Sequence, residues 1–206
     1  MKKSITPNQI RQNNIHLIYQ YIYQSGTTSQ QDISYALHLS RPTVAGVLTE
    51  LEDIGLIQKS GQLDSDYVGR KATAYSIVPD HKLSIGVEII AGQVKIVAVD
   101  LYEKYIKREV YEITFSNDEE YFKKVCKYIT DFVDSIEYSF SPISNNEKYK
   151  HILGAGIALQ ALISPDGSTA TYGKILDCTG LKIDNFSKHL PFPCTFIHDS
   201  TAAAVS

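Results

Sequence analysis

The sequence predicts an α/β protein of two domains: a helical domain closed by a β-hairpin, followed by a domain built on a β-sheet. Three observations support this prediction. Three short amphipathic segments come before residue 56, strand-like alternation begins after Pro79, and one strongly periodic helix interrupts those strands. We therefore expect the first domain to comprise residues 1–78 and the second to comprise residues 79–206.

The first two helical segments have clear ends. Residues 13–26 (NNIHLIYQYIYQSG) place Ile15, Ile18, Tyr19 and Ile22 on one helical face, and Gly26 ends the run. Residues 28–39 (TSQQDISYALHL) form the second segment. Its expected N-cap is Ser29, three residues before Asp32, and its expected apolar stripe is Ile33, Ala36 and Leu37.

A third helix is predicted in residues 40–55 (SRPTVAGVLTELEDIG), after a break of a few residues. Ser40 is the expected N-cap, and a proline in the first turn is tolerated. Its inward positions are Val44, Leu48 and Leu51, and Gly55 stops it. Residues 56–61 (LIQKSG) and 70–78 (RKATAYSIV) then indicate the two strands of a hairpin.

Three short helices followed by a β-hairpin are typical of a winged helix-turn-helix, whose third helix enters the major groove of DNA. We expect the polar start of that helix and the wing to contact an operator, and arginine is favoured in a narrow minor groove. The residues expected at the DNA are Ser29, Gln30, Ser40, Arg41, Pro42, Thr43, Gly46, Arg70 and Lys71.

The charge of the first domain leaves a second interpretation open. Residues 1–80 carry seven basic and seven acidic side chains, whereas DNA-binding domains usually show a basic excess. A small helical domain used for protein contacts is therefore the alternative. The placement of Arg41, Arg70 and Lys71 at the expected contact points favours DNA.

The composition is that of an ordinary globular protein: 206 residues, 43% apolar and 21% charged, with a formal net charge of -3. No apolar stretch approaches the ~20 residues that span a bilayer, and no apolar run follows the N-terminal lysines. Three widely spaced cysteines suit a reducing compartment, so we expect a cytoplasmic protein without membrane contact.

Four possible metal ligands occur near the C-terminus: Cys178, His189, Cys194 and His198. Their spacing matches no compact zinc pattern such as CxxC. The sequence therefore predicts no metal site.

For the second domain, the sequence predicts three strands, a helix, and then further strands and helices. Residues 83–90, 93–101 and 106–115 form an expected antiparallel meander, and a helix follows with Asn117 as its cap and Glu120 at the capping-box position. Its buried stripe is Phe122, Val125, Ile129, Phe132, Val133 and Ile136.

After a polar linker, residues 151–163 (HILGAGIALQALI) predict a buried strand and residues 164–167 (SPDG) a turn. A short helix at 182–190, a strand at 193–197 and the start of another helix at 199–206 follow. This order is that of one lobe of an actin-like, sugar-kinase-type ATPase fold.

A winged helix joined to such a lobe, with GAGIALQALISPDG and later PCTFIHDSTAAA, resembles the sugar-responsive repressors of the ROK family (repressors, open reading frames, kinases). The resemblance extends from about residue 10 to the end. IHDSTAAA is similar to the family's Asn-Asp-Ala-Asn-Ala-Ala-Ala, whose aspartate is the general base of the kinases. The resemblance implies sugar-binding roles for Asp199, for His198 in place of the asparagine, and for Gln160, where the family has proline.

The resemblance also implies that kinase activity is lost. The phosphate-binding hairpin of the kinases reads Asp-x-Gly-Gly-Thr-Lys, and here Glu88 stands for the aspartate and Ile90 for the first glycine. Gly92 and Gln93 replace the threonine and the lysine. A branched side chain obstructs the approach of phosphate to backbone N–H groups, and the donors are missing. We expect a structural remnant, no cofactor and no enzyme.

The family's second lobe has no counterpart before Ser206, so we expect a fragment, a truncated gene, or a half-pocket supplied from elsewhere. The leading hypothesis is a homodimeric repressor of carbohydrate utilisation that binds double-stranded operator DNA and a small sugar effector. A DNA-binding module with a ligand-free lobe and a sugar kinase are the alternatives. Asp199 could equally be only an N-cap of the last helix.

Overall fold

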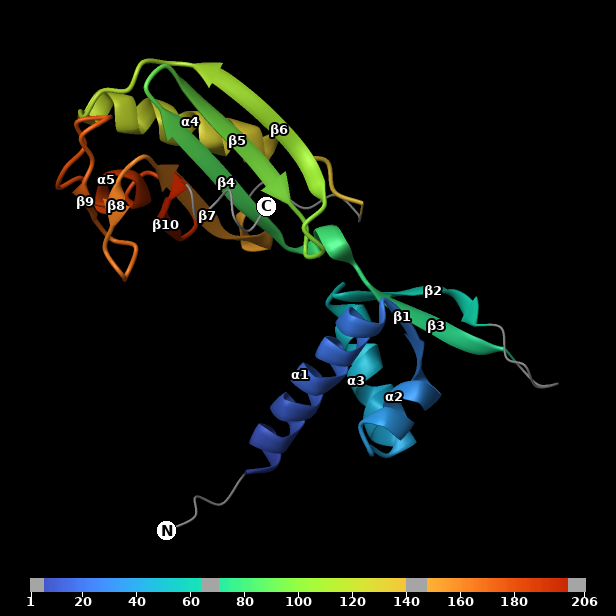
Figure 1. Cartoon of the computed structure of the whole chain (residues 1–206). Coiled ribbons are helices and arrows are strands. Elements are labelled where there is room, and N and C mark those ends of the chain that lie inside the picture. Colours follow the sequence, from blue (N-terminus) through green and yellow to red (C-terminus); the bar gives the residue numbers. More distant parts are fainter. Residues whose placement is uncertain (1–5, 64–70, 140–147, 200–206) are drawn as a thin grey trace, which may run out of the picture. The chain divides into compact units, whose positions relative to one another are not determined.

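The computed structural model describes residues 6–63, 71–139 and 148–199 (Figure 1). The chain forms two compact units, Met1–Val78 and Pro79–Ser206. Each unit is described by itself below.

The first unit contains the three predicted helices, and each begins at a side chain that caps it. The helices are α1 (Pro7–Ser25), α2 (Gln30–Ala36) and α3 (Arg41–Asp53). The caps at Ser29 and Ser40 are confirmed, and Ser29 forms a reciprocal capping box with Asp32. Helix α1 begins earlier than the sequence pattern indicated, because Thr6 and Gln9 form a capping box of their own.

A three-stranded antiparallel sheet closes this unit. Its strands are β1 (Thr27–Ser29), β2 (Ile57–Leu63) and β3 (Ala72–Ile77), in the order β1-β3-β2. The hairpin was predicted, but the short strand β1 was not. The core contains Ile18, Ile22, Ile33, Val44, Val47, Leu48, Leu51 and Ile57. The expected stripe of α2 is wrong at one position, because Ala36 at the end of that helix is exposed.

The second unit is built on a five-stranded sheet of order β10-β7-β4-β5-β6. Strands β4 (Leu83–Ile90), β5 (Gln93–Val99) and β6 (Tyr105–Glu112) form the predicted antiparallel meander. Strands β7 (Ile152–Leu159) and β10 (Cys194–His198) extend it on the other side, parallel to β4. The lobe predicted from the order of elements is thus confirmed.

Short elements connect these strands. The 3₁₀ turns are η1 (Pro79–His81) and η2 (Lys148–His151), and β8 (Leu162–Ile163) pairs with β9 (Ala170–Tyr172). Residues 200–206 of the expected last helix lie outside the described residues.

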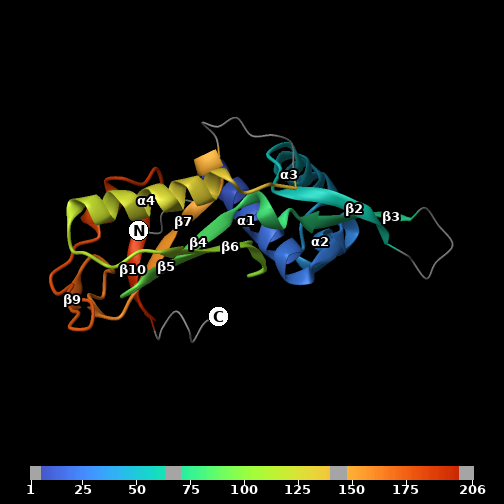
Figure 2. The same cartoon turned by 90° about the horizontal axis from the view of Figure 1, so that it is seen from above.

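Helices α4 (Glu119–Asp134) and α5 (Asp184–Ser187) contribute to a single core on one face of the sheet (Figures 1 and 2). The six residues of the predicted stripe are all buried, although Ile136 lies beyond the end of α4. Its cap is Asp118 rather than Asn117, because the carboxylate of Asp118 accepts the Tyr121 N–H at 2.8 Å. The ring of Tyr121 packs against Phe115, with centroids 5.1 Å apart, which fixes this start.

The opposite face of the sheet is covered by no helix of the described residues. Along β4, buried residues alternate with exposed or half-buried ones such as Gly86 and Glu88, which lie on this second face. None of the described helices combines the length and apolar character that crossing a bilayer requires.

Candidate nucleic-acid interface and candidate ligand cleft

The start of α3 presents polar groups on a rigid base. The Ser40 hydroxyl accepts the Thr43 N–H at 3.3 Å and lies 2.8 Å from the Thr43 hydroxyl, so it fixes the first turn. Beneath that turn, Val44 and Leu48 are buried in the core. Arg41 is exposed, and its guanidinium makes no hydrogen bond or ion pair with the described part of the chain. Its guanidinium is therefore available to an external anion or base.

Helix α2 supports this turn from the side. The Gln30 side chain donates from Nε2 to the Arg41 carbonyl oxygen at 3.0 Å, which ties the starts of α2 and α3 together. Ser29 is 3% exposed, and its hydroxyl donates to Asp32 at 2.6 Å. Ser29 therefore positions α2, and its hydroxyl is not offered to solvent.

Gly46 lies on the exposed side of α3. A Cβ atom built there would meet nothing within 4 Å, so no contact within the chain requires glycine. An interior helical glycine lowers helix stability by about 1 kcal/mol relative to alanine. The absence of a packing reason is consistent with a surface that another molecule approaches closely.

Charges are segregated along α3. Two acidic residues of its second half form ion pairs with basic residues of other elements. Arg11 pairs with Glu50 at 2.7 Å, and Lys59 pairs with Glu52 at 2.7 Å. These pairs neutralise carboxylates toward the C-terminal end of the helix, whereas Arg41 is at the N-terminal end. The zero net charge of residues 1–80 is therefore compatible with a locally basic start of α3.

The wing is only partly described. Lys71 is exposed immediately before β3, whereas Arg70 lies outside the described residues.

In the second unit, three strand ends meet at one edge. Parallel pairing places Leu159 beside His198 and Ile89 beside Leu159. The residues that follow these strands, Gln160 and Asp199, are therefore neighbours at the carboxyl edge. Ligands of open α/β sheets commonly bind outside that edge.

His198 and Asp199, the two titratable residues predicted to bind a sugar, are in contact with one another. His198 Nδ1 lies 3.0 Å from Asp199 Oδ1, and the two side chains are 36% and 29% exposed. They border different hollows. His198 lines a depression of about 610 Å³ beside the turn of residues 164–167, and Asp199 lines one of about 360 Å³ on the uncovered face of the sheet. Gln160 is not among the residues that line either depression.

The turn beside His198 is held firmly. Gly167 adopts φ +70°, and its carbonyl oxygen accepts the Phe196 N–H at 2.8 Å. Hydrogen bonds from Ser164 and Ser168 lower the pKa of Asp166 to about 2, and they all reach one oxygen of its carboxylate, Oδ1. The turn thus forms a fixed wall of this depression.

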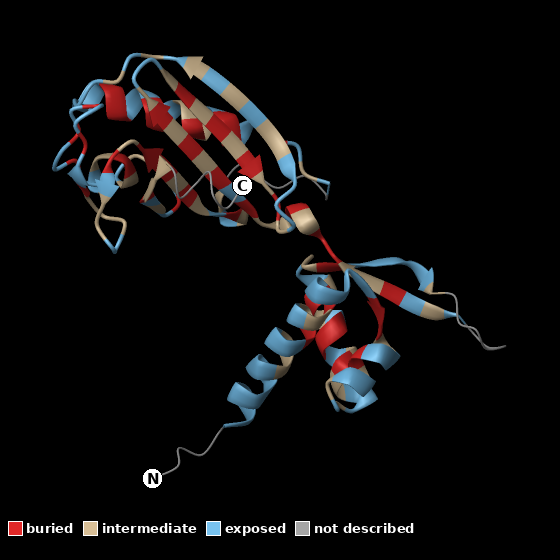
Figure 3. Ribbon diagram, viewed as in Figure 1, coloured by how far each residue is buried: buried red, intermediate tan, exposed pale blue. Residues whose placement is uncertain are grey.

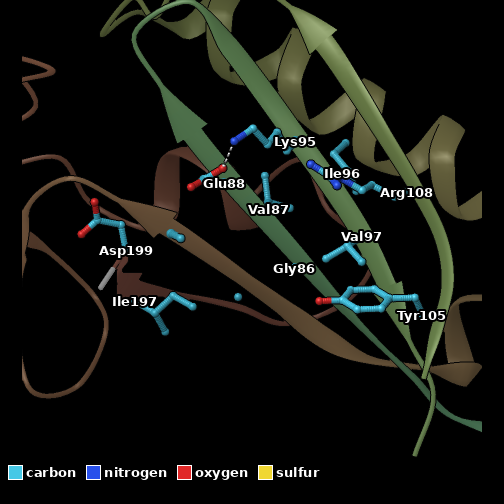
Figure 4. Close-up of a pocket in the computed structure, with 12 residues that line it drawn as sticks. Gly86, Val87, Glu88, Lys95, Ile96, Val97, Tyr105, Arg108, Ile197 and Asp199 are labelled. Carbon is cyan, nitrogen blue, oxygen red and sulfur yellow. Dashed lines mark hydrogen bonds and ion pairs between the residues drawn. The ribbon is translucent and has the colours of Figure 1, made fainter. Parts of the chain in front are cut away.

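The depression on the uncovered face is lined in part by the β4–β5 hairpin (Figure 4). Glu88 and Lys95 lie opposite one another on β4 and β5 and form an ion pair of 2.6 Å. The carboxylate that stands for the kinase aspartate is thus neutralised by a side chain of the same hairpin. At the hairpin tip, the carbonyl oxygens of Ala91 and Gly92 accept N–H groups of residues 115 and 113.

The cysteines are suited to packing rather than to metal binding. Burial raises the pKa of Cys126 to about 12 and that of Cys194 to about 11, so both thiols stay protonated at neutral pH. Within the described residues, no three His, Cys, Asp or Glu side chains gather in a way that could hold a metal ion.

Known proteins are similar to both units of the chain. Residues 13–64 match the MarR family. The chain is 21% identical over 159 residues to the DNA-binding transcriptional repressor Mlc of Escherichia coli (strain K12), covering 77% of this chain and 37% of that protein. A solved ROK family transcriptional regulator, described as a homologue of that protein, matches 95% of this chain and 48% of its own at 17% identity, with a TM-score of 0.60.

A ROK family glucokinase from Streptomyces griseus matches 59% of the chain at 15% identity, with a TM-score of 0.48. The chain spans less than half the length of Mlc and about half that of the solved regulator. The chain is thus similar to ROK family transcriptional repressors, and part of its first unit is similar to the MarR family.

Proposed function

We propose that this homologue of ROK family repressors is a DNA-binding transcriptional repressor of carbohydrate-utilisation genes, and that its second unit responds to a sugar. The observation that carries the proposal is the start of α3. There Arg41 is exposed on a capped and firmly packed turn, and its guanidinium is unpaired among the described residues. The second unit of the chain has the sheet of the solved ROK regulator.

The DNA contacts follow from the exposure of the side chains. Arg41 is suited to guanine or phosphate, and Thr43 and Pro42 lie beside it on the first turn. Gly46 allows a close approach of the phosphate backbone, and Lys71 with Arg70 extends the contact to the wing. Ser29, Ser40 and Gln30 hold the two helices in position through caps and a backbone hydrogen bond.

A dimer is part of the proposal. One recognition helix reads one half-site, and operators with two-fold symmetry match proteins with two-fold symmetry. We therefore expect a homodimer on a palindromic operator. A sugar can weaken that complex only through a difference in its affinity for the two conformations of the dimer.

The sugar contacts belong to the carboxyl edge of the sheet. A carboxylate such as Asp199 accepts hydrogen bonds from two vicinal hydroxyls, and His198 can donate one. Gln160 follows the neighbouring strand. Because the matched proteins are about twice as long as this chain, the rest of the pocket is expected from a further segment or a second molecule.

Kinase activity is not part of the proposal. Ile90 and Gln93 occupy the positions that need bare backbone and a donor, and Lys95 holds the carboxylate of Glu88 at 2.6 Å. No hexose-dependent release of ADP from ATP is expected. Turnover in a coupled ADP-release assay would contradict this part of the account.

The experiment that tests the sugar response is release of a bound operator, followed by fluorescence anisotropy, across a panel of hexoses. Asp199→Asn keeps the shape of the side chain and removes its charge, so it should abolish the response while leaving operator affinity unchanged. Asp177→Asn, at an exposed turn, is the matched control and should respond as the wild type does.

One observation favours a second candidate, a DNA-binding module whose lobe takes no ligand. His198 and Asp199 line different depressions, so they do not converge on one pocket in the described residues. Operator binding without any sugar response in the wild type would support this candidate and contradict the sensor.

A further inference from the structure

The side of α3 that faces away from the core carries no charge from Pro42 to Thr49. The buried residues of this helix lie together on its other side, in the core of the first unit (Figure 3). Pro42, Ala45, Gly46 and Thr49 are spaced by three, one and three residues, so they share one face of the helix. Ala45 is half-buried and the other three are exposed. We call these four residues the α3 face.

The α3 face offers almost no hydrogen-bonding groups to another molecule. The side chains of proline, alanine and glycine can neither donate nor accept a hydrogen bond. The hydroxyl of Thr49 donates its one proton to the backbone oxygen of Ala45 at 3.1 Å. Apart from the ring of Pro42, this face therefore presents the methyl groups of Ala45 and Thr49.

Gly46 leaves a gap between these methyl groups. A Cβ atom there would meet nothing within 4 Å, so packing within the chain does not require the glycine. A longer side chain would hold the helix away from any surface in front of it. The glycine thus lets a partner come within contact distance of Ala45 and Thr49.

Charged groups surround the α3 face without entering it. Arg41 precedes it, with a guanidinium that is unpaired among the described residues. Glu50 and Glu52 flank it, and both are neutralised by ion pairs. Asp53 lies one helical turn beyond Thr49, on the same side of the helix. A nucleic acid at the start of α3 therefore meets a cation first and meets a repelling carboxylate only beyond Thr49.

From these observations we infer that the α3 face reads thymine, through contacts of its methyl groups with C5-methyl groups in the major groove. Thymine alone among the four bases presents an apolar group there, and alanine and threonine methyl groups are suited to contact it. The other three bases present only donors and acceptors, which this face would leave without a partner. The inference rests on the proposed DNA-binding function and deepens it by naming the bases that are read.

The dimensions of the helix limit the number of bases. From Pro42 to Thr49 the helix rises about 10 Å, which corresponds to about three base-pair steps. Ala45 and Thr49 lie one helical turn apart, so each contacts a different thymine. We therefore expect two thymines in each half-site, close to the position that Arg41 contacts.

Replacement of thymine by deoxyuridine tests the inference, because it removes the C5-methyl group and leaves base pairing unchanged. The probe is the duplex that the full wild-type chain enriches most from a random-sequence pool, with each thymine replaced in turn. Burial of one methyl group corresponds to about a fourfold gain in affinity. In fluorescence anisotropy, the wild type should thus bind about fourfold more weakly when either contacted thymine is replaced.

Two variants assign the two contacts. Thr49→Ser keeps the hydroxyl and removes a methyl group, and Ala45→Gly removes the other methyl group. Each variant should lose its sensitivity to deoxyuridine at one position and keep it at the other. The matched control is Thr130→Ser in α4, because the hydroxyl of Thr130 likewise donates to a backbone oxygen of its helix, that of Lys127, at 2.9 Å. This control should respond to deoxyuridine as the wild type does.

A third variant tests the close approach of the DNA. Gly46→Gln should raise stability in urea, because glycine is the poorer helix former. It should nevertheless weaken binding to the same duplex at least about tenfold, because the longer side chain holds the helix away from the bases. A loss of affinity together with a gain in stability cannot come from unfolding. Unchanged affinity would overturn the inference.

Failure of this inference is distinguishable from failure of the DNA-binding proposal. If every thymine of the enriched duplex can be replaced without loss of affinity, the inference is overturned and DNA binding stays supported. The same holds if Thr49→Ser and Ala45→Gly keep the full sensitivity of the wild type. If no sequence is enriched from the pool, the DNA-binding proposal fails and the inference fails with it.

Discussion

Replacing Arg41 by alanine should weaken operator binding without weakening the fold. Its guanidinium is exposed and makes no hydrogen bond or ion pair with the described residues, so the free energy of unfolding should change by no more than about 0.5 kcal/mol. The Arg41 carbonyl oxygen still accepts from Gln30 in the variant, because that bond uses the backbone. The start of α3 is therefore expected to keep its position.

The loss in binding can be bounded. An arginine that donates two hydrogen bonds to guanine contributes about 1–3 kcal/mol of discrimination, which corresponds to a loss of about five- to 150-fold in half-site affinity. If Arg41 instead contacts phosphate, affinity should fall about equally for all sequences. The slope of log affinity against log salt concentration should then decrease by about one.

The matched control is Arg11→Ala. This arginine is also exposed, but it is already paired with Glu50, and an exposed ion pair contributes at most about 1 kcal/mol to stability. We expect Arg11→Ala to bind DNA as the wild type does, in fluorescence anisotropy at two salt concentrations. If Arg41→Ala and Arg11→Ala bind equally well, Arg41 is not a contact and the reasoning from the start of α3 is refuted.

Two further predictions concern the second unit. Gly167 and Gly180 both have positive φ, but a Cβ atom at Gly167 would lie 2.0 Å from Thr195 Oγ1, while at Gly180 it meets nothing within 4 Å. In urea denaturation, Gly180→Ala should lower the free energy of unfolding by about 1–2 kcal/mol, and Gly167→Ala should lower it clearly more. Equal losses in the two variants would disprove the packing argument. Burial lowers the pKa of His81 below 6.5, and electrostatic repulsion from the neighbouring His151 lowers it further. The unfolded chain therefore binds the proton more readily, and the melting temperature should fall as the pH drops through about 6.5, less so in His81→Gln; parallel pH profiles would contradict this.

The elements that could be predicted are those whose signals are local. Ser29 with Asp32 and Ser40 before Pro42 are cap patterns within four residues, and the structure has both caps. The stripe of α4 is periodic over four turns, so the pattern identified most of its buried face, although it missed Tyr121 and Cys126. Alternation along residues 83–90 likewise gave the bounds of β4.

The missed elements depend on contacts distant in sequence or on choices between neighbours. Strand β1 has three residues and exists because β3 pairs with it, so no periodicity could reveal it. Asn117 and Asp118 are both good caps, and packing of Tyr121 against Phe115 selects the second. The start of α1 was missed because its first half has no buried residue, and hydrophobic periodicity finds only helices that have one.

The candidate ligand site was predictable as a set of residue types but not as a geometry. The resemblance to the ROK family pointed to His198 and Asp199, but adjacent residues at a strand end can line different depressions, as these do. The ion pair of Glu88 and Lys95 joins residues opposite one another in a hairpin, and it becomes evident only once the register is known.

The most direct test of the central claim is selection of DNA from a random-sequence pool by the full chain, followed by sequencing of the bound fraction. The account predicts enrichment of one two-fold symmetric sequence, with half-sites separated by one helical turn, about 10 base pairs, or a multiple of it. Arg41→Ala should lose the preference at one position of each half-site. A bound fraction without any enriched sequence, or the same sequence selected equally well by Arg41→Ala, would contradict the account.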